Sequence, residues 1–380
     1  MAQEQYDLVI YGATGFTGAL VSQYLHARAG DEGLRWAMAG RAMEKLAALR
    51  DEIGCTEAGL IEADAADSAA LAQMVAATRA VVSTVGPYQL HGEPLVEACA
   101  NAGKGYVDLC GEPLWMRAMI DRYEGIARAN GARILFSCGF DSIPAELGVW
   151  ACQAEAVRTL GHPLPRIRGR MRTFVGGPSG GSVASGMAMM ELAREDPAKG
   201  ALLADPYALT PGFAGPAHPE YNLVEDEAGL GPVGPFTLGP TDMKNVHRSN
   251  LLQGHPYGTD FVYDEKLVNP PPPPSQPLSL DKLPKPGEGP SAEVMANGRF
   301  DLLIIGEEDG AEKVHVVVKG DQEPGYKTTS MLISETAFAL LAADNLSPGI
   351  WTPIAALGSA LADRIARHTP VVVTLENSGV

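Results

Sequence analysis

The sequence predicts an α/β fold whose main element is a doubly wound parallel sheet. Short apolar runs alternate with helical patterns over residues 1–146, and a glycine-rich turn follows the first of these runs. Strands separated by helices are typical of βαβ units, in which parallel strands lie side by side. The rhythm changes near residue 147, and a chain of 380 residues is long enough for two domains.

The predicted elements of the first domain, residues 1–146, follow from apolar spacing. Continuous apolar runs such as YDLVIY have the pattern of strands buried on both faces, and they predict strands at 6–11, 34–39, 58–62, 80–85, 106–109 and 133–137. Apolar residues at helical spacing lie between these runs and predict helices at 18–28, 43–53, 68–77, 93–102 and 113–130.

Residues 147–328 are predicted to form a second domain with a less regular pattern. The same spacing rules predict a helix at 145–160, a strand at 166–175, a helix that ends near Arg194, and strands at 300–305 and 313–319. Residues 205–290 hold most of the prolines, and the run from 270 to 274 predicts polyproline II, a stiff spacer or a surface strap. Residues 329–380 are expected to hold two further helices, at 329–344 and 355–368.

Composition excludes several classes of partner. The chain has 46 acidic and 29 basic side chains, a formal charge of −17, whereas nucleic acid binding needs clustered Lys and Arg. The same charge disfavours an anionic membrane surface, and no apolar run approaches bilayer length. The five cysteines form no CxxC pair and no metal-spaced cluster, which indicates reduced thiols, no metal site and a cytoplasmic protein. The first residues lack a signal-peptide pattern.

The turn after the first strand, GATGFTG, carries the strongest functional signal. Gly12, Gly15 and Gly18 are spaced GxxGxxG between a predicted strand and a predicted helix, the context in which such glycines bind a dinucleotide in a Rossmann fold. Amides at the start of the helix can receive a pyrophosphate, and Thr14 and Thr17 add hydroxyl donors around Phe16. An ordinary strand-to-helix loop is the alternative, which the surrounding strand and helix disfavour.

The end of the second strand indicates which dinucleotide is bound. NAD-selective sites place a carboxylate there for the ribose 2′-hydroxyl, but this strand ends in AGR. A guanidinium can pair with a 2′-phosphate, so Arg41, assisted by Lys45, predicts NADP(H); a solvated helix start is the alternative for Arg41. Asp64, after the third strand, is a further candidate for the adenine side or a loop cap.

A loop after the fourth strand is expected to pass the nicotinamide half of the cofactor, since ligands lie at the carboxyl edge of such sheets. This loop and the earlier motifs complete the expected cofactor-binding set: Gly12, Thr14, Gly15, Phe16, Thr17, Gly18, Arg41, Lys45, Asp64, Ser83, Thr84, Val85, Gly86 and Pro87.

The motifs GATGFTG, AGR, STVGPY, YVDLCGE and SCGFDSIPAE occur in this order, and VVVKGDQEPGY, SETAFALLA and GIWTP follow near the end. Together they resemble the saccharopine dehydrogenase-like oxidoreductases, in particular the branch of trans-acting enoyl reductases. The resemblance covers residues 6–195 and the C-terminal part. Residues 205–300 match poorly, which suggests a substrate lid as the alternative to a strap.

The resemblance implies a Rossmann domain combined with a second α/β domain whose sheet is mostly antiparallel, with residues 329–380 packing back on the first domain. It implies NADPH-linked reduction of an enoyl, lipid-like or polyketide-like substrate, and a homodimer. A saccharopine-type amino-acid dehydrogenase acting on a C–N bond is the second hypothesis, with Arg168, Arg170 and Arg172 on one strand face as a carboxylate clamp or as a solvated face. A cofactor-binding scaffold without turnover is the third.

Hydride transfer also needs a group that protonates or stabilises the developing anion. Tyr88 and His91 lie on the loop GPYQLHG and can donate a proton, although His91 can equally bond the backbone. The resemblance includes a glycine–x–aspartate turn that corresponds to Gly139 and Asp141, which makes Asp141 the third catalytic candidate. The expected substrate contacts are Cys110, Cys138, Ser179 and Gly180, with core packing as the alternative for both thiols.

Overall fold

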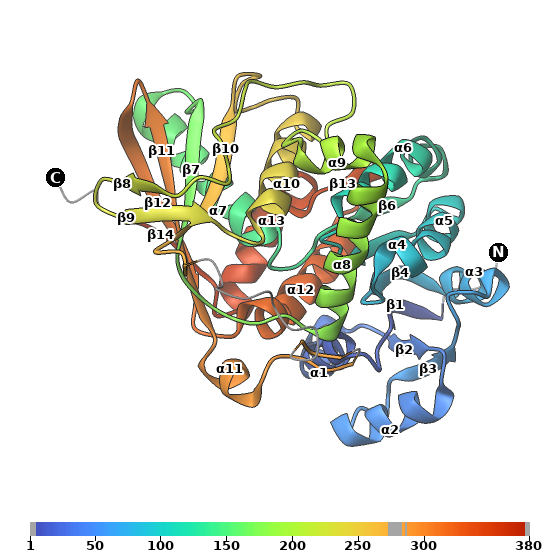
Figure 1. Ribbon diagram of the computed structural model, residues 1–380. Coiled ribbons are helices and arrows are strands. Elements are labelled where there is room, and N and C mark those ends of the chain that lie inside the picture. Colours follow the sequence, from blue (N-terminus) through green and yellow to red (C-terminus); the bar gives the residue numbers. More distant parts are fainter. Residues whose placement is uncertain (1–4, 273–282, 286, 377–380) are drawn as a thin grey trace.

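The computed structural model describes residues 5–272, 283–285 and 287–376, which form two seven-stranded sheets with helices around them (Figure 1). The first sheet is parallel throughout, in the order β13-β6-β5-β4-β1-β2-β3. Its strands are β1 (Tyr6–Tyr11), β2 (Trp36–Gly40), β3 (Gly59–Glu62), β4 (Thr78–Ser83), β5 (Gly105–Asp108), β6 (Arg133–Leu135) and β13 (Gly349–Trp351). The predicted doubly wound α/β fold is confirmed.

Both faces of the first sheet are buried, as its apolar strands predict. Within β1, Leu8 and Ile10 belong to one core cluster and Val9 and Tyr11 to another, because successive side chains point to opposite faces. The helices that follow these strands are α1 (Phe16–Glu32), α2 (Met43–Ile53), α3 (Ser68–Ala76), the short α4 (Tyr88–His91), α5 (Glu93–Ala102) and α6 (Pro113–Asn130).

The second sheet has the order β14-β12-β11-β7-β10-β9-β8 and is mostly antiparallel, with β7 and β10 as its parallel pair. Its strands are β7 (Arg166–Val175), β8 (Glu225–Glu227), β9 (Gly231–Pro235), β10 (Val262–Val268), β11 (Arg299–Glu308), β12 (Ala311–Gly320) and β14 (Val372–Leu375). The mixed sheet that the family resemblance implies is therefore present.

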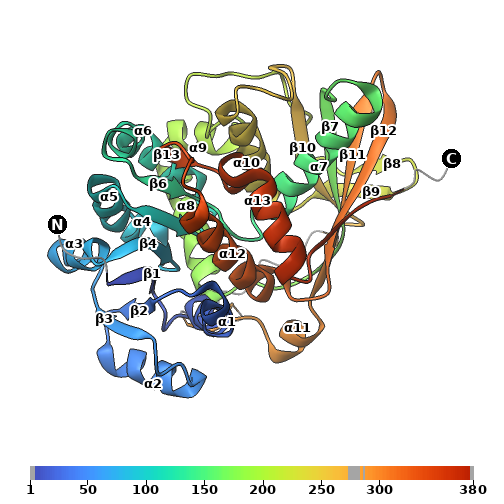
Figure 2. The same cartoon turned by 180° about the vertical axis from the view of Figure 1, so that it is seen from behind.

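The remaining helices pack between or beside the two sheets. They are α7 (Ile143–Leu160), α8 (Gly180–Glu195), α9 (Pro197–Ala204), α10 (Gly239–Leu252), α11 (Ala292–Asn297), the π-helix η2 (Pro324–Thr328), α12 (Thr329–Ala342) and α13 (Pro353–His368). Helix α12 packs on α1, β4 and β5, and α13 packs on α12 and α7, as the view from behind shows (Figure 2). Among the described residues, no helix is long and apolar enough to cross a bilayer.

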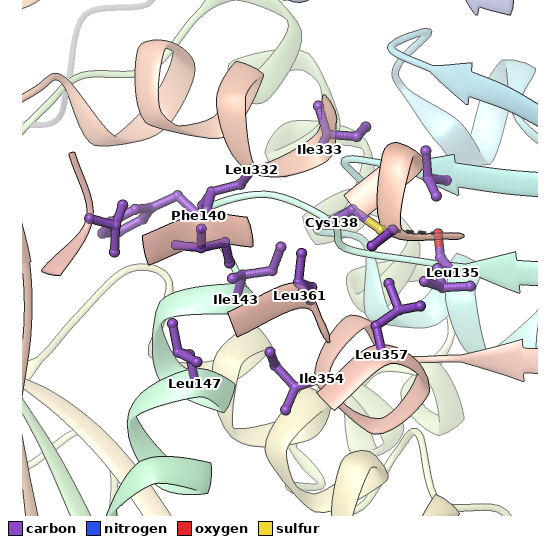
Figure 3. Close-up of a cluster of buried hydrophobic side chains, with 14 of the residues drawn as sticks. Leu135, Cys138, Phe140, Ile143, Leu147, Leu332, Ile333, Ile354, Leu357 and Leu361 are labelled. Carbon is purple, nitrogen blue, oxygen red and sulfur yellow. Dashed lines mark hydrogen bonds between the residues drawn. The ribbon is translucent and has the colours of Figure 1, made fainter. Parts of the chain in front are cut away.

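An apolar cluster joins the two halves of the molecule. The side chains labelled in Figure 3 come from β6 and the loop after it, from α7, from α12 and from α13, and they point toward one another. Phe140, Ile143 and Leu332 are at most 3% exposed. Burial of side chains of this size contributes about 1.5–3 kcal/mol each, so the cluster holds the two sheets in a fixed arrangement.

The proline-rich segment 205–290 differs from the expected lid or strap. It supplies β8, β9 and β10 to the second sheet, and its helix α10 is buried along most of its length. The predicted polyproline run at 270–274 extends into residues outside the described part of the chain. Most of the segment is therefore integral to the second domain, because its strands complete a sheet and its helix fills the interface.

Candidate active site at the carboxyl edge of the parallel sheet

The glycines of GATGFTG are required by close backbone contacts. Gly12 has a φ of +87°, and a Cβ there would lie 2.6 Å from the Cγ2 atom of Val85. A Cβ on Gly18 would lie 2.2 Å from the carbonyl oxygen of Gly12. The first turn of α1 thus packs directly on the loop after β1, which leaves no room for side chains in this cradle.

Donors at the start of α1 are available to an anion. Gly15 is the N-cap and provides no side-chain cap, so the amides of the first helical turn have no intrahelical partner. Thr14 and Gly15 are exposed, whereas the ring of Phe16 packs edge-to-face on the ring of Tyr326, with 5.2 Å between the ring centroids. A pyrophosphate fits this arrangement, because amides at a helix start attract negative charge.

Arg41 follows the carboxyl end of β2 and Lys45 lies in the first turn of α2, the two positions at which the sequence predicts contact with a 2′-phosphate. Both side chains are exposed, and neither makes a hydrogen bond or ion pair with the rest of the described chain. The charges of Asp64 and Arg41 act in opposite directions on the pKa of Tyr11, which burial raises to about 12. Both residues therefore flank the end of β1, although one Asp64 oxygen accepts the amide of Ala66 at 2.9 Å.

The loop after β4 is fixed to the glycine loop. The Thr84 hydroxyl donates to the carbonyl oxygens of Tyr11 and Gly12, at 3.2 and 3.1 Å, and the Thr84 amide donates to Tyr11 at 2.9 Å. Ser83 is buried, whereas Gly86 is exposed. These bonds place residues 83–87 beside the cradle, where the sequence predicts the nicotinamide half of a cofactor.

Glu112 connects this loop to the second domain. Its carboxylate accepts hydrogen bonds from the amides of Tyr88 and Gln89, at 2.8 and 2.9 Å, and from the hydroxyl of Ser185 at 2.6 Å. Ser185 lies on α8, which stands between the two sheets in Figure 1. One buried carboxylate thus joins the start of α4 to α8.

Tyr88 is held within the protein. Its hydroxyl donates to the carbonyl of Ser83 at 3.1 Å and accepts from the amide of Leu109 at 3.1 Å, and the side chain is 5% exposed. This geometry gives Tyr88 a positioning role between two loops. His91 is exposed at the end of α4, away from those bonds.

Asp108 organises the loops after β5 and β6. It accepts the amides of Cys110 and Ser137, at 3.1 and 2.9 Å, and the hydroxyl of Tyr106 at 3.0 Å. Complete burial raises the pKa of Asp108 to about 7, against the effect of these donors. Ser137 has a φ of +57°, an uncommon conformation for a residue with a side chain, and its hydroxyl donates to Cys110 at 2.6 Å.

Asp141 lies on the loop after β6, against the loop after β5. A Cβ on Gly111 would lie 2.9 Å from its Oδ2 atom, so glycine leaves the space that the carboxyl occupies. Burial raises the pKa of Asp141 to about 6, and no cation opposes that shift. Its charge also raises the pKa values of the Cys110 thiol and the Tyr326 hydroxyl, as the smallest of the causes that act on each group. A carboxyl with this pKa can hold a proton near neutral pH.

The expected substrate contacts need correction. Cys110 and Cys138 are fully buried, and Figure 3 shows the Cys138 thiol within the apolar cluster, where it bonds to the carbonyl of Leu135 at 3.4 Å. Neither thiol is accessible to a substrate in this structure. Ser179 caps α8 by accepting the amide of Ser182 at 3.2 Å, and the amide of Gly180 donates to Glu288 at 3.0 Å. Both residues use these groups to begin the helix.

The arginines of β7 form neither a clamp nor a solvated face. Arg170 is 2% exposed and bonds to Glu227 and Asp264, Arg168 pairs with Glu227, Glu307 and Glu312, and Arg172 pairs with Asp301 and Glu376. Their charges are matched by carboxylates of the same sheet and its flanking strands. The proposed carboxylate clamp is therefore wrong, because these guanidinium groups stabilise the sheet.

Sequence reasoning missed Tyr326, which joins the start of α8 to the first turn of α1. Its hydroxyl accepts the amide of Ser179 and bonds to the Ser182 hydroxyl at 2.9 Å, while its ring contacts Phe16. The π-helix that carries it is capped by Glu323, which accepts the amides of three residues. The motif QEPGY, residues 322–326, leads into this π-helix and could have drawn attention to Tyr326, since single-turn π-helices are frequent at functional sites.

Comparisons with known proteins identify the family of this chain. Residues 8–135 match the family model described as the saccharopine dehydrogenase NADP binding domain. The chain is 37% identical to a candidate trans-acting enoyl reductase of Mycobacterium tuberculosis, over 95% of each chain, and 35% identical to the trans-acting enoyl reductase of Mycobacterium ulcerans, over 98% of each. Saccharopine dehydrogenase (L-Glu forming) from Saccharomyces cerevisiae has the same fold, with a TM-score of 0.53 and 12% identity over 98% of this chain and all of that one.

These relatives span nearly the whole chain at identities well above 30%. The predicted NADP-binding loop lies inside the matched domain, and the two-sheet architecture is that of the saccharopine dehydrogenase structure. The chain belongs to the trans-acting enoyl reductase family of saccharopine dehydrogenase-like, NADP-binding oxidoreductases.

Proposed function

We propose that the protein is an NADPH-dependent reductase of the carbon–carbon double bond of an enoyl substrate. The observation that carries this proposal is the partly buried carboxyl of Asp141, which follows β6 at the carboxyl edge of the parallel sheet, lies beside Gly111 and has a pKa raised by burial to about 6. Its relatives are named trans-acting enoyl reductases, which supports the same chemistry.

The residues of the cradle fit the cofactor. The amides at the start of α1 would hold the pyrophosphate, Arg41 and Lys45 the 2′-phosphate, and residues 83–87 the nicotinamide side. When bound, NADPH supplies the hydride of the reduction. The glycines exclude side chains that would fill this space, as the contacts of Gly12 and Gly18 require.

The protein must then supply one proton to the substrate carbon that becomes an anion. Asp141 can hold that proton, because its pKa of about 6 keeps part of the carboxyl protonated near neutral pH. Gly111 keeps the space beside the Oδ2 atom of Asp141 free of a side chain. Tyr88 and His91 are weaker candidates. The Tyr88 hydroxyl already makes two hydrogen bonds within the protein, and the His91 side chain lies on the surface.

The proposal also includes the kind of substrate, the oligomeric state and the cellular compartment. Exposed apolar side chains, Met187 and Met190 on α8 and Leu90 on α4, suit a lipid-like or polyketide-like acyl chain. The exposed edge strand β14 can pair with a second copy as a homodimer, because an unpaired edge accepts another strand. Five free cysteines suit the reducing cytoplasm.

A direct assay separates this activity from the alternatives. We expect NADPH oxidation with enoyl thioesters and none with 2-oxo acid and amine pairs, because the arginines that would bind substrate carboxylates are all paired. Turnover of an amine pair would overturn the proposal, and tight NADPH binding without turnover on any acceptor would favour a scaffold. Cofactor binding is measured by fluorescence titration and turnover by absorbance at the NADPH band.

Arg41→Ala is expected to weaken NADPH binding by about 10- to 100-fold and NADH binding much less, because a charge-assisted bond to the 2′-phosphate is lost. Dissociation constants for both cofactors, measured by fluorescence, check this. Arg35→Ala is the matched control, since Arg35 is an exposed arginine beside the opposite end of β2 and should change neither constant. Equal weakening of both cofactors by Arg41→Ala would contradict the role of Arg41.

A further inference from the structure

Helices α8 and α9 lie over the first domain, and α9 stands beside α6 in both overall views (Figure 1, Figure 2). Among the residues described in these two helices, only Gly180 is buried. Met187 and Met190 of α8 are 52% and 65% exposed, whereas a helix on a domain surface usually turns its apolar side chains toward the core. The two helices therefore rest on the first domain without forming a packed apolar interface.

A groove of about 360 Å³ lies between these helices and α6. Leu114 and Ala118 of α6, one turn apart, line it on one side, and Leu192 of α8 and Leu202 of α9 line it on the other. The volume lies within the range of about 300–1,000 Å³ that is typical of small-molecule sites. A small ligand with an apolar body therefore fits between the helices.

The charged side chains that line the groove are mostly matched by one another. Arg117 pairs with Asp121 at 2.9 Å, and Arg122 pairs with Glu93 at 2.5 Å. Lys199 is exposed to solvent. An occupant with a charge of its own would lose hydration without gaining a buried ionic partner, which is costly. The groove therefore suits an uncharged chain.

One end of the groove lies close to Glu112, beside the loop that is predicted to pass the nicotinamide. Gln89 lines the groove, and its backbone amide donates to Glu112 at 2.9 Å. Ser185 donates to the same carboxylate at 2.6 Å, and a Cβ on Gly86 would lie 3.8 Å from its Oγ atom. Leu192 lies on the same face of α8 as Ser185, about 10 Å further along the helix. The groove therefore extends away from the cofactor loop along α8.

The candidate proton donor lies on the other side of Glu112. Glu112 follows Gly111 in the chain, and a Cβ on Gly111 would lie 2.9 Å from the Oδ2 atom of Asp141. Asp141, the cofactor loop and the groove thus adjoin one short segment, residues 111 and 112. A substrate whose double bond lies between Asp141 and the cofactor loop can extend its remaining carbons into the groove.

We propose that this groove binds the apolar end of the acyl chain of the enoyl substrate, and that Ala118, Leu192 and Leu202 determine which chain lengths are reduced. The inference rests on the proposed reductase function and specifies its substrate as a thioester of a long acyl chain. Each methylene that enters the groove leaves water, which favours the longer substrate. Ala118 is the smallest of the three side chains, so a larger residue at this position would occupy the space of the chain.

Rates with thioesters of different chain length test the groove. We expect kcat/KM of the wild type to be about 100-fold higher for a dodecenoyl than for a crotonyl thioester, because only the longer chain fills the groove. Ala118→Leu should lower the dodecenoyl value about tenfold or more and leave the crotonyl value unchanged. Ala129→Leu is the matched control, since Ala129 is exposed on the same helix outside the groove, and it should change neither value.

Leu202→Ala provides a second variant should Ala118→Leu fail to fold, since α9 lies on the surface. It should lower kcat/KM for the dodecenoyl thioester about three- to tenfold and leave the crotonyl value unchanged, because an apolar wall is lost. Leu203→Ala, on the same helix but outside the groove, should affect neither substrate.

The outcomes separate the groove from the reductase function. Identical chain-length profiles in Ala118→Leu and Ala129→Leu would overturn the groove, even if the wild type reduces a crotonyl thioester. An equal loss at every chain length in Ala118→Leu would also overturn it, because the apolar end of the chain would then not be what the groove binds. Absence of turnover with every enoyl thioester would overturn the function instead. Calorimetric binding of the saturated dodecanoyl thioester, weakened by Ala118→Leu and not by Ala129→Leu, would then still support the groove, and equal binding would exclude it.

Discussion

Replacing Gly18 by alanine is expected to abolish useful NADPH binding. The new Cβ would lie 2.2 Å from the carbonyl oxygen of Gly12 and 2.9 Å from the Cα atom of Ala13, and backbone atoms cannot turn away as side chains can. Helix α1 must then move off the loop that receives the pyrophosphate. We expect affinity to fall about 100-fold or more, with a stability loss of about 1–3 kcal/mol from overpacking.

Gly30→Ala provides the matched control on the same helix. Gly30 has no atom within 4 Å of the position of a Cβ and lies in α1, so alanine should raise stability by about 0.5–1 kcal/mol and leave NADPH affinity unchanged. Fluorescence titration and urea denaturation measure both quantities. Normal NADPH affinity in Gly18→Ala would show that this loop is not the cofactor cradle.

Asp141→Asn is expected to have the largest effect on turnover. Asparagine keeps the shape of the side chain but cannot give up a proton, so kcat should fall by about 10²–10⁴ while NADPH affinity stays the same. The comparison variant is His91→Ala, which removes an exposed candidate donor and should change kcat little. Unchanged kcat in Asp141→Asn would exclude Asp141 as the proton donor.

The same substitution should stabilise the fold at neutral pH. The pKa of Asp141 is raised from 3.8 to about 6, so the folded protein binds more protons than the unfolded chain between these pH values. The contribution of the protonated Asp141 carboxyl to the free energy of unfolding is fully present below pH 3.8, and it is lost as pH rises through about 6. Asp141→Asn should therefore be more stable than wild type above pH 6, by on the order of 2 kcal/mol.

The proton-donor role also predicts a pH profile. Only the protonated carboxyl donates, so the wild-type rate should decline as pH rises through about 6, and the residual rate of Asp141→Asn should lack this decline. Initial rates between pH 5 and 9 at saturating substrate check both curves. A wild-type rate that rises through this range would contradict the assignment.

The cofactor side of the protein could be predicted from sequence because its chemistry is local. A strand, a glycine turn and a helix follow one another within the first 32 residues, and the glycines have the spacing that close backbone contact requires. Arg41 stands directly after a buried strand, at a position that the pattern itself identifies. Such signals need no knowledge of distant partners.

The second domain could not be predicted in the same way, because segments of it that are rich in polar residues are buried, whereas polar residues are expected on the surface. Helix α10 is buried through Asp242, Asn245 and neighbouring polar residues, so it has no apolar stripe to find. Strand β10 carries Asp264 and Glu265 at its centre, where apolar residues are expected. The partners that satisfy the β7 arginines come from β8, β10, β11 and β12 and from Glu376 just after β14, and sequence spacing gives no access to such pairings.

Strand β13 has a consequence for how this protein is made. Its three residues, Gly349–Trp351, pair with β6 and complete a sheet whose other strands all precede residue 136. Until residues 329–342 leave the ribosome, the surface beneath α12 is uncovered, and until residues 349–351 follow, β6 is an open edge. The cofactor domain is therefore finished by the end of the chain, and both domains should fold and unfold as one cooperative unit.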